Sequence, residues 1–280
     1  MVKNRKEFSY RCNKMINLSL VNKYWSKKID CLSKFFSMEK IYLGVLLLII
    51  NYSLSATTYY VSPNGSDNNS GSSSQPFATW QKGVNVAAAG DIVYIRGGIY
   101  YTSGSLRTTG YCGVFIQNKN GTSDNLISIL AYPGEIPILD CSGMTQSGDQ
   151  HIGISIESSS YLHLKGLRIR NVKAASGYTA TGISTYRMNN SKLELISVSG
   201  TQGPGFGIDG NNNLILNCDA FDNYDSQSGG EHGDGFIFGH NDSRTTNSLY
   251  GCRSWNNSDD GFDTYGNEGT IIWEKCWSFN

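Results

Sequence analysis

Two short stretches near the end of the 280-residue chain place aspartates beside a repeated Gly-Phe pair. "EHGDGFIFGH" contributes Asp234, and "NNSDDGFDTYG" contributes Asp259, Asp260 and Asp263. Carboxylates held this close together repel one another, so some of them would have to take up protons. A hard cation with oxygen ligands removes the repulsion, and calcium suits an extracellular protein best. The four aspartates are therefore predicted to bind calcium.

A purely structural interpretation of these residues stays open. Asp, Asn and Gly are ordinary turn residues of a β-solenoid, and "DDG" alone is typical of a solvated turn. The matching Asp234 one coil earlier, followed by the same Gly-Phe, favours metal binding. The ion could still serve only to rigidify the stack.

Internal repeats set the spacing of these segments. Phe206, Phe236 and Phe262 follow one another at separations of 30 and 26 residues, and each comes after a glycine. Such a period is the signature of a solenoid. A second series consists of "CDAFDN", "CRSWNN" and "CWSFN".

The second series predicts two columns of side chains. Its cysteines, Cys218, Cys252 and Cys276, recur at one point of the repeat, which favours buried stacked thiols over disulfides or a zinc site. The aromatic residues three positions later are Phe221, Trp255 and Phe279. We expect them to form an aromatic ladder, with Trp255 and Phe279 stacking within the core; the alternative for these two is a platform for sugar rings.

The elements that carry these columns have strand periodicity. Segments such as "KLELISV" alternate apolar and polar residues, and no amphipathic stretch long enough for a helix in every unit is present. The sequence predicts an all-β fold, a right-handed parallel β-helix, in which residues one coil apart lie about 4.8 Å from each other. A helix at about Phe77 to Ala88 is expected to cap its N-terminal end.

The N-terminal region differs in charge from the remainder. Residues 1–40 hold ten basic and three acidic side chains, and the remaining chain holds 13 and 20, a net charge of −7. An acidic body argues against nucleic-acid binding. Residues 38–56 have the pattern of a secretory signal peptide, whose apolar run from Ile41 to Ile50 is too short to span a membrane as a helix. An N-terminal anchor is the alternative.

This pattern divides the chain into three parts. Residues 1–37 form a doubtful extension, 38–56 the signal peptide, and 57–280 the β-helix domain, which ends inside a repeat at Asn280 and is expected to be incomplete. We predict a monomer, secreted to the extracellular space or the periplasm, without stable membrane insertion.

The segment "GDGF", followed about one coil later by "CRSWNNSDDGFD", resembles the pectate lyases of polysaccharide lyase family 9. The likeness runs from about Thr58 to the end of the chain. It implies calcium bound by Asp234, Asp259, Asp260 and Asp263, and an acidic, polygalacturonate-like substrate cleaved by β-elimination. The proton-abstracting lysine of the family would lie in a later coil, beyond the last residue, so the catalytic residue is unassigned.

Further residues near the aspartates are weaker candidates. Arg253 is expected to face outward, where it could bind a uronate carboxylate of the substrate or remain a solvated surface arginine. His232 and His240 flank the first aspartate segment; either could contact substrate, but we expect both to be exposed or locally hydrogen-bonded. Glu231 could support the metal. Lys275 is expected to face outward and does not match the lysine of the family.

Two other functions remain open from the sequence. One is a polygalacturonase-like glycoside hydrolase, which would use paired carboxylates on the same fold. The chain lacks the Gly-His-Gly and Arg-Ile-Lys segments expected for that family. The other is a non-catalytic polysaccharide-binding β-helix stabilised by calcium.

Overall fold

Short alternating segments form the strands of the protein. The computed structural model describes residues 56–107, 110–147, 149–239 and 244–279, and also Lys23, residues 26–28, Asp30 and Ser33, which are helical. The rest of the predicted extension (1–37) and of the predicted signal peptide (38–56) lies outside the described residues. The chain divides into two units, residues 1–54 and 55–280, and the second is the β-helix. None of the described helices is long and apolar enough to cross a membrane.

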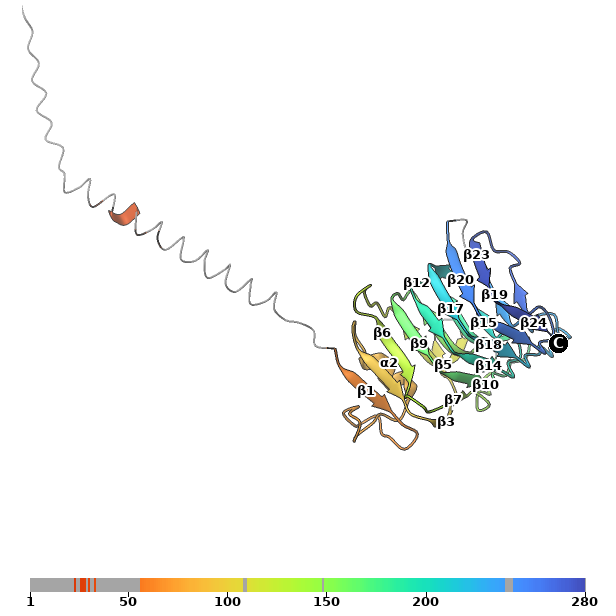
Figure 1. Ribbon diagram of the computed structural model, residues 1–280. Helices are drawn as coiled ribbons and strands as arrows, with labels where there is room; N and C mark the ends of the chain where they lie inside the picture. The colour runs from red at the N-terminus through yellow and green to blue at the C-terminus, as the bar shows by residue number, and fades with distance from the viewer. Residues whose placement is uncertain are drawn as a thin grey trace, which may run out of the picture. The chain divides into compact units, whose positions relative to one another are not determined.

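The described residues of the second unit form three large sheets, named here sheets 1, 2 and 3 in the order in which each coil visits them (Figure 1). Sheet 1 contains β1 (Thr58–Val61), β2 (Ile92–Ile95), β6 (Ile127–Ala131), β9 (Leu162–Lys165), β13 (Lys192–Glu194), β17 (Asn213–Leu216), β20 (Thr246–Tyr250) and β23 (Thr270–Glu274). Sheet 2 contains β3 (Gly98–Tyr101), β7 (Pro137–Asp140), β10 (Arg168–Arg170), β14 (Ser197–Ser199), β18 (Asp219–Phe221), β21 (Arg253–Trp255) and β24 (Trp277–Phe279).

Sheet 3 contains β4 (Ser105–Arg107), β5 (Gly110–Gln117), β8 (His151–Glu157), β11 (Ala180–Tyr186), β15 (Phe206–Gly207), β19 (Phe236–Ile237) and β22 (Phe262–Asp263). A smaller sheet pairs β12 (Met188–Asn189) with β16 (Gly210–Asn211). Strands pair in parallel with the equivalent strand of the next coil, and the exception among the described strands is the antiparallel pair β4 and β5. The predicted parallel β-helix is confirmed.

One column of aromatic residues fills the inside of sheet 3. The rings of Phe206 and Phe236 stack with centroids 4.6 Å apart, and those of Phe236 and Phe262 stack at 5.1 Å. Phe206 and Phe236 are fully buried. The repeated phenylalanine of the sequence is therefore a core column.

The cysteine column also lies inside. Cys218 and Cys252 are fully buried, Cys276 is half-buried, and all three are free thiols. The prediction of stacked thiols without disulfides is confirmed for these residues.

The second aromatic column lies on the outside of sheet 2, so the prediction that it belongs to the core is wrong. Phe221 and Trp255 stack with centroids 4.4 Å apart, and Phe279 follows at 5.8 Å from Trp255. Between the cysteines and these rings, Ala220 and Ser254 are fully buried and point inward. Side chains alternate along a strand, so the residues that follow Ala220 and Ser254 point outward.

Turns between the sheets differ in length. Sheets 1 and 2 are joined by a tight corner with a left-handed backbone, occupied in successive coils by Gly166, Leu195, Asn217, Gly251 and Lys275, with φ between 51° and 73°. Longer segments join sheet 2 to sheet 3, and these carry Asp234, Asp259 and Asp260. These segments are longer than the tight corner between sheets 1 and 2, and functional groups usually lie on loops of this kind.

The predicted cap is present as helix α2 (Trp80–Val86), which is shorter than expected. The Thr79 side chain accepts a hydrogen bond from the backbone N–H of Lys82 and begins the helix. Trp80 and Val84 are buried in the core. The helix packs on β1, β2 and β5 and covers the N-terminal end of the stack.

Candidate metal centre

Three of the four predicted aspartates lie together. One carboxylate oxygen from each of Asp234, Asp259 and Asp260 falls within 4.8 Å of the others. The carboxylate of Asp263 lies outside this set, and it accepts a hydrogen bond from the backbone N–H of Tyr265 at 2.7 Å. We call the first three residues the acidic cluster.

The register of β19 on β22 brings the cluster together. Phe236 pairs with Phe262 and Ile237 with Asp263, an offset of 26 residues, so Asp234 lies level with Asp260. The backbone N–H of Asp260 donates to Oδ1 of Asp234 at 3.2 Å. Two segments that are distant in sequence therefore present their carboxylates at one place.

The glycine before each phenylalanine is required by this packing. A Cβ on Gly235 would lie 2.0 Å from Oγ of Ser254 and 2.6 Å from the carbonyl oxygen of Gly261. A Cβ on Gly261 would lie 2.0 Å from Oγ of Ser278. The repeated Gly-Phe thus lets the chain pass close to sheet 2 while the ring enters the core.

Burial and mutual repulsion perturb the acidic cluster. Asp234 is 3% exposed, whereas Asp259 and Asp260 are exposed. Burial, followed by the charges of Asp259 and Asp263, raises the pKa of Asp234 to about 7. Burial and the charges of Asp260 and Asp263 also raise the pKa of Asp259. Without a counter-charge, the cluster holds a proton near neutral pH.

The cluster fits a calcium ion. Calcium lies about 2.3–2.6 Å from its oxygen ligands, so ligands on opposite sides of the ion are about 5 Å apart. Three oxygens within 4.8 Å of one another can therefore contact one ion. A cation between them would offset the repulsion that raises the pKa of Asp234.

His232 and Glu231 lie on the solvent side of the cluster. Both are exposed, and Nδ1 of His232 lies 3.2 Å from Oδ2 of Asp225. The expectation of a locally hydrogen-bonded His232 is confirmed. Its charge acts to lower the pKa of Asp259, and that of Glu231 acts to raise it. His240 lies outside the described residues.

Asp225 was not foreseen from the sequence. Its carboxylate is fully buried in the segment between sheets 2 and 3, where it accepts hydrogen bonds from the Ser228 hydroxyl at 2.7 Å and the Gln227 backbone N–H at 2.9 Å. It holds the loop that leads to Asp234. It lies in a run of polar residues, "DNYDSQSGGEHGD", in which no periodicity marks the buried positions.

Lys275 lies at the corner between sheets 1 and 2, not in the segment that holds the cluster. Its ammonium group donates a hydrogen bond to the Tyr250 hydroxyl, and this bond raises the pKa of Lys275. The outward orientation expected from the sequence is confirmed. A lysine held in its charged form is unsuited to accept a proton.

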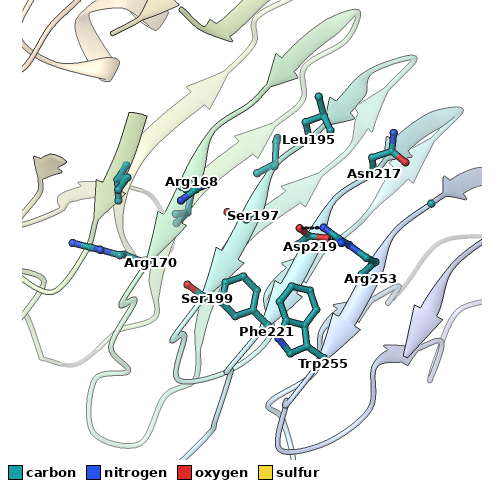
Figure 2. Close-up of a pocket in the computed structure, with 14 residues that line it drawn as sticks. Arg168, Arg170, Leu195, Ser197, Ser199, Asn217, Asp219, Phe221, Arg253 and Trp255 are labelled. Atoms are coloured by element: carbon teal, nitrogen blue, oxygen red, sulfur yellow. Dashed lines mark hydrogen bonds and ion pairs between the residues drawn. The ribbon is translucent and has the colours of Figure 1, made fainter. Parts of the chain in front are cut away.

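Arg253 lies on the outer face of sheet 2. Its Nε and Nη2 atoms donate to the two carboxylate oxygens of Asp219, each at 2.7 Å, as the dashed line in Figure 2 shows. Its guanidinium also lies 5.8 Å from the centre of the Trp255 ring. The outward orientation agrees with the expectation, and one carboxylate partner is already supplied by the protein.

Known proteins share both the sequence pattern and this architecture. Residues 59–280 match the family model described as "Pel9A-like, right handed beta helix region". Pectate lyase PEL9 of Emericella nidulans is 30% identical over 75% of this chain and 50% of its own length. Pectate lyase L of Dickeya chrysanthemi is 27% identical over 79% of this chain and 50% of its own. The chain spans about half the length of the curated relatives it matches.

Solved structures give the same result. The crystal structure of pectate lyase Pel9A superposes with a TM-score of 0.64 at 25% identity, covering 79% of this chain and 53% of that one. A rhamnogalacturonan lyase, at 22% identity and a TM-score of 0.52, covers 80% of this chain and 63% of its own and shares the fold. The family match over residues 59–280 also confirms the predicted right-handedness. This chain belongs to the Pel9A-like right-handed β-helix family.

Proposed function

We propose that this chain is the calcium-binding part of a secreted lyase that cleaves a pectate-like acidic polysaccharide by β-elimination. The observation that carries the proposal is the convergence of Asp234, Asp259 and Asp260 within 4.8 Å. The relatives that share this fold are named pectate lyases. The signal-like segment 38–56 supports export, and a secreted enzyme would meet both calcium and its polymer outside the cell.

The chemistry of the substrate explains why an acidic protein needs a cation. Polygalacturonate is a polyanion, and residues 41–280 carry a net charge of −7, so the two repel each other. A calcium ion bound at the cluster would attract the uronate carboxylate and make the proton on C5 of the sugar more acidic. Asp234, held by the N–H of Asp260, and the exposed Asp259 and Asp260 would hold the ion. The position of the ion would in turn determine where the uronate carboxylate lies.

β-Elimination then requires a base. The base takes the C5 proton, the electron pair forms a double bond between C4 and C5, and the C4–O4 bond breaks. The departing O4 takes up a proton and leaves an unsaturated uronate. Lys275 is bound to Tyr250 at a different corner of the coil, and we assign this step to none of the described residues.

The placement of Lys275 favours a second candidate function. With its ammonium group held by Tyr250, the described part of the chain could bind calcium and polysaccharide without cleaving. The same acidic cluster would then rigidify the stack and contact the uronates.

One set of measurements separates these functions. The purified 280-residue chain is titrated with calcium by calorimetry, and then incubated with polygalacturonate with calcium or with a chelator. Calcium uptake together with an unsaturated, ultraviolet-absorbing product supports the lyase. Calcium-dependent retention of the polymer without product supports the binding module, saturated reducing ends formed in chelator support a hydrolase, and absence of calcium uptake overturns the proposal.

A further inference from the structure

A second surface, on the outside of sheet 2, is built from large and small side chains in register. Arg168 and Arg170 of β10 pair with Ser197 and Ser199 of β14. The same serines pair with Asp219 and Phe221 of β18. A row of serines therefore lies between a row of arginines and a row that contains an aromatic ring, as Figure 2 shows.

This arrangement leaves a trough over β14. Strands lie about 4.8 Å apart, so the two rows of large side chains are separated by about 9.6 Å, with the serine hydroxyls on the floor between them. The concave surface has a volume of about 680 Å³ and extends to Leu195 at the corner with sheet 1. Leu195 is 50% exposed with a left-handed backbone (φ 53°), so an apolar side chain marks one end of the trough.

The charges in the trough leave one arginine without a partner. Arg253 is neutralised by Asp219, and Nε of Arg170 donates to Oδ2 of the buried Asp140 at 2.7 Å. Among the residues that the structure describes, Arg168 has no acidic partner, and it is exposed. The partner Asp140 is on β7, so the Arg170 side chain extends to the side of β10 that is away from β14 (Figure 2). The trough therefore has an unbalanced positive charge on an otherwise acidic protein.

The aromatic wall offers a flat surface. One face of the Phe221 ring is covered by Trp255, with the two planes 3° apart. The opposite face lies on the side of Ser199, whose short side chain leaves it open (Figure 2). Aromatic faces carry partial negative charge and attract the C–H groups of a sugar ring.

We propose that this trough binds a short segment of an acidic glycan independently of calcium. A sugar ring would lie over Ser197 and Ser199 against the open face of Phe221, and its carboxylate would pair with Arg168. Arg is suited to this role because its planar donors match a carboxylate. The choice of a uronate-containing chain rests on the proposed function, whereas the shape and charge of the trough do not.

The trough is distinct from the acidic cluster. It lies on the outer face of sheet 2 between β10 and β21, whereas the cluster lies in the segments that lead from sheet 2 to sheet 3. Trp255 is common to the trough and to a hollow beside Asp259 and Asp260. A bound segment in the trough would thus add affinity for the polymer without contributing a ligand to the ion.

The test is binding of a short oligogalacturonate in the presence of a chelator, measured by calorimetry on the full chain. We expect wild-type protein and Asp234→Asn to bind equally. Arg168→Gln should bind at least about tenfold more weakly, since a charge-assisted hydrogen bond contributes about 1.5–3 kcal/mol. Ser199→Trp should abolish binding by filling the trough. Arg187→Gln removes an exposed arginine elsewhere and should bind like wild type.

Several results would overturn the proposal. They are wild-type protein without affinity in chelator, unchanged binding by both Arg168→Gln and Ser199→Trp, or equal binding of the methyl-esterified, uncharged oligomer. Circular dichroism of each variant checks that it is folded. Calcium uptake by the same proteins reports separately on the acidic cluster. A trough that does not bind the oligomer would leave the proposed function unaffected, and a cluster that does not bind calcium would leave the trough proposal unaffected.

Discussion

The Asp234 carboxylate accepts a hydrogen bond from the Asp260 backbone N–H at 3.2 Å, which ties the side chain of one coil to the main chain of the next. This contact orients a 3%-exposed carboxylate toward two exposed ones. Such an arrangement is unfavourable by itself, because burial and like charges both oppose ionisation. The consequences can be measured with and without calcium.

Asp234→Asn should abolish calcium uptake and yet stabilise the calcium-free protein at pH 8. Asparagine can still accept the Asp260 N–H while removing the charge that burial and neighbours disfavour. A pKa raised from 3.8 to about 7 corresponds to about 4 kcal/mol, and solvent around the exposed Asp259 and Asp260 reduces this to about 1–2 kcal/mol. Urea unfolding in chelator measures the gain.

The matched control for this substitution is Asp124→Asn, which neutralises an exposed aspartate in a turn. It should leave both calcium uptake and the unfolding midpoint unchanged. If Asp234→Asn bound calcium with wild-type affinity, the ion would bind somewhere other than the acidic cluster.

Stability and calcium affinity should depend on pH in opposite ways. Without calcium, folded Asp234 keeps its proton up to about pH 7, whereas an unfolded aspartate loses it near pH 3.9. The folded state then binds more protons in this interval, so stability in chelator falls as the pH rises from about 4 to 7. Calcium must displace that proton, so its affinity should fall about tenfold per pH unit below pH 7. Titrations at pH 5, 6, 7 and 8 test both trends, and a flat affinity profile would contradict them.

The repeat was visible in the sequence because like residues recur at like places. The separation of Phe236 and Phe262 in the Gly-Phe pairs gave the length of one coil. The alternation of apolar and polar residues then predicted an all-β solenoid. Alternation could also have placed the second aromatic column. Counting by two from the inward Cys218 puts Ala220 inside and Phe221 outside, so the residue three positions after each cysteine cannot share its side.

Other features could not be predicted from the sequence. The trough exists because Ser197 and Ser199 lie in register with arginines one coil before and with Asp219 and Phe221 one coil after. Coils here have unequal lengths, so the register depends on loops that carry no periodicity. The burial of Asp225 in such a loop is likewise a product of tertiary packing.

A network of charged side chains on the outside of sheet 1 should stabilise the fold at neutral pH and lose this effect in acid. Glu194 accepts hydrogen bonds from His163 at 2.9 Å, and it pairs with Lys165 at 3.0 Å and Lys192 at 2.7 Å. Burial acts to raise its pKa, but the hydrogen bonds from these three side chains lower the pKa to about 2.

Glu194→Gln should therefore lower the free energy of unfolding by about 1–3 kcal/mol at pH 7. The pKa of Glu194 in the folded protein lies below its unfolded value of 4.5. Its contribution to the free energy of unfolding is therefore complete above pH 4.5 and is lost as the pH falls toward 2. Unfolding curves at pH 7 and pH 3 should show a smaller difference between variant and wild type at the lower pH. An equal difference at both would mean that packing, not charge, is responsible.

The two aromatic columns should differ in their contribution to stability, although both consist of stacked rings. Phe236 is fully buried between Phe206 and Phe262, so Phe236→Ala removes core contacts and leaves a cavity, at about 3–5 kcal/mol. Phe221 stacks on Trp255 but faces solvent, so Phe221→Ala should lose only the ring-pair contribution of about 0.5–1.5 kcal/mol. Urea midpoints of the two variants, measured in chelator, give the comparison. Equal losses would mean that the outer column is covered in the folded protein. The outer face of sheet 2 would then not be a surface open to ligand.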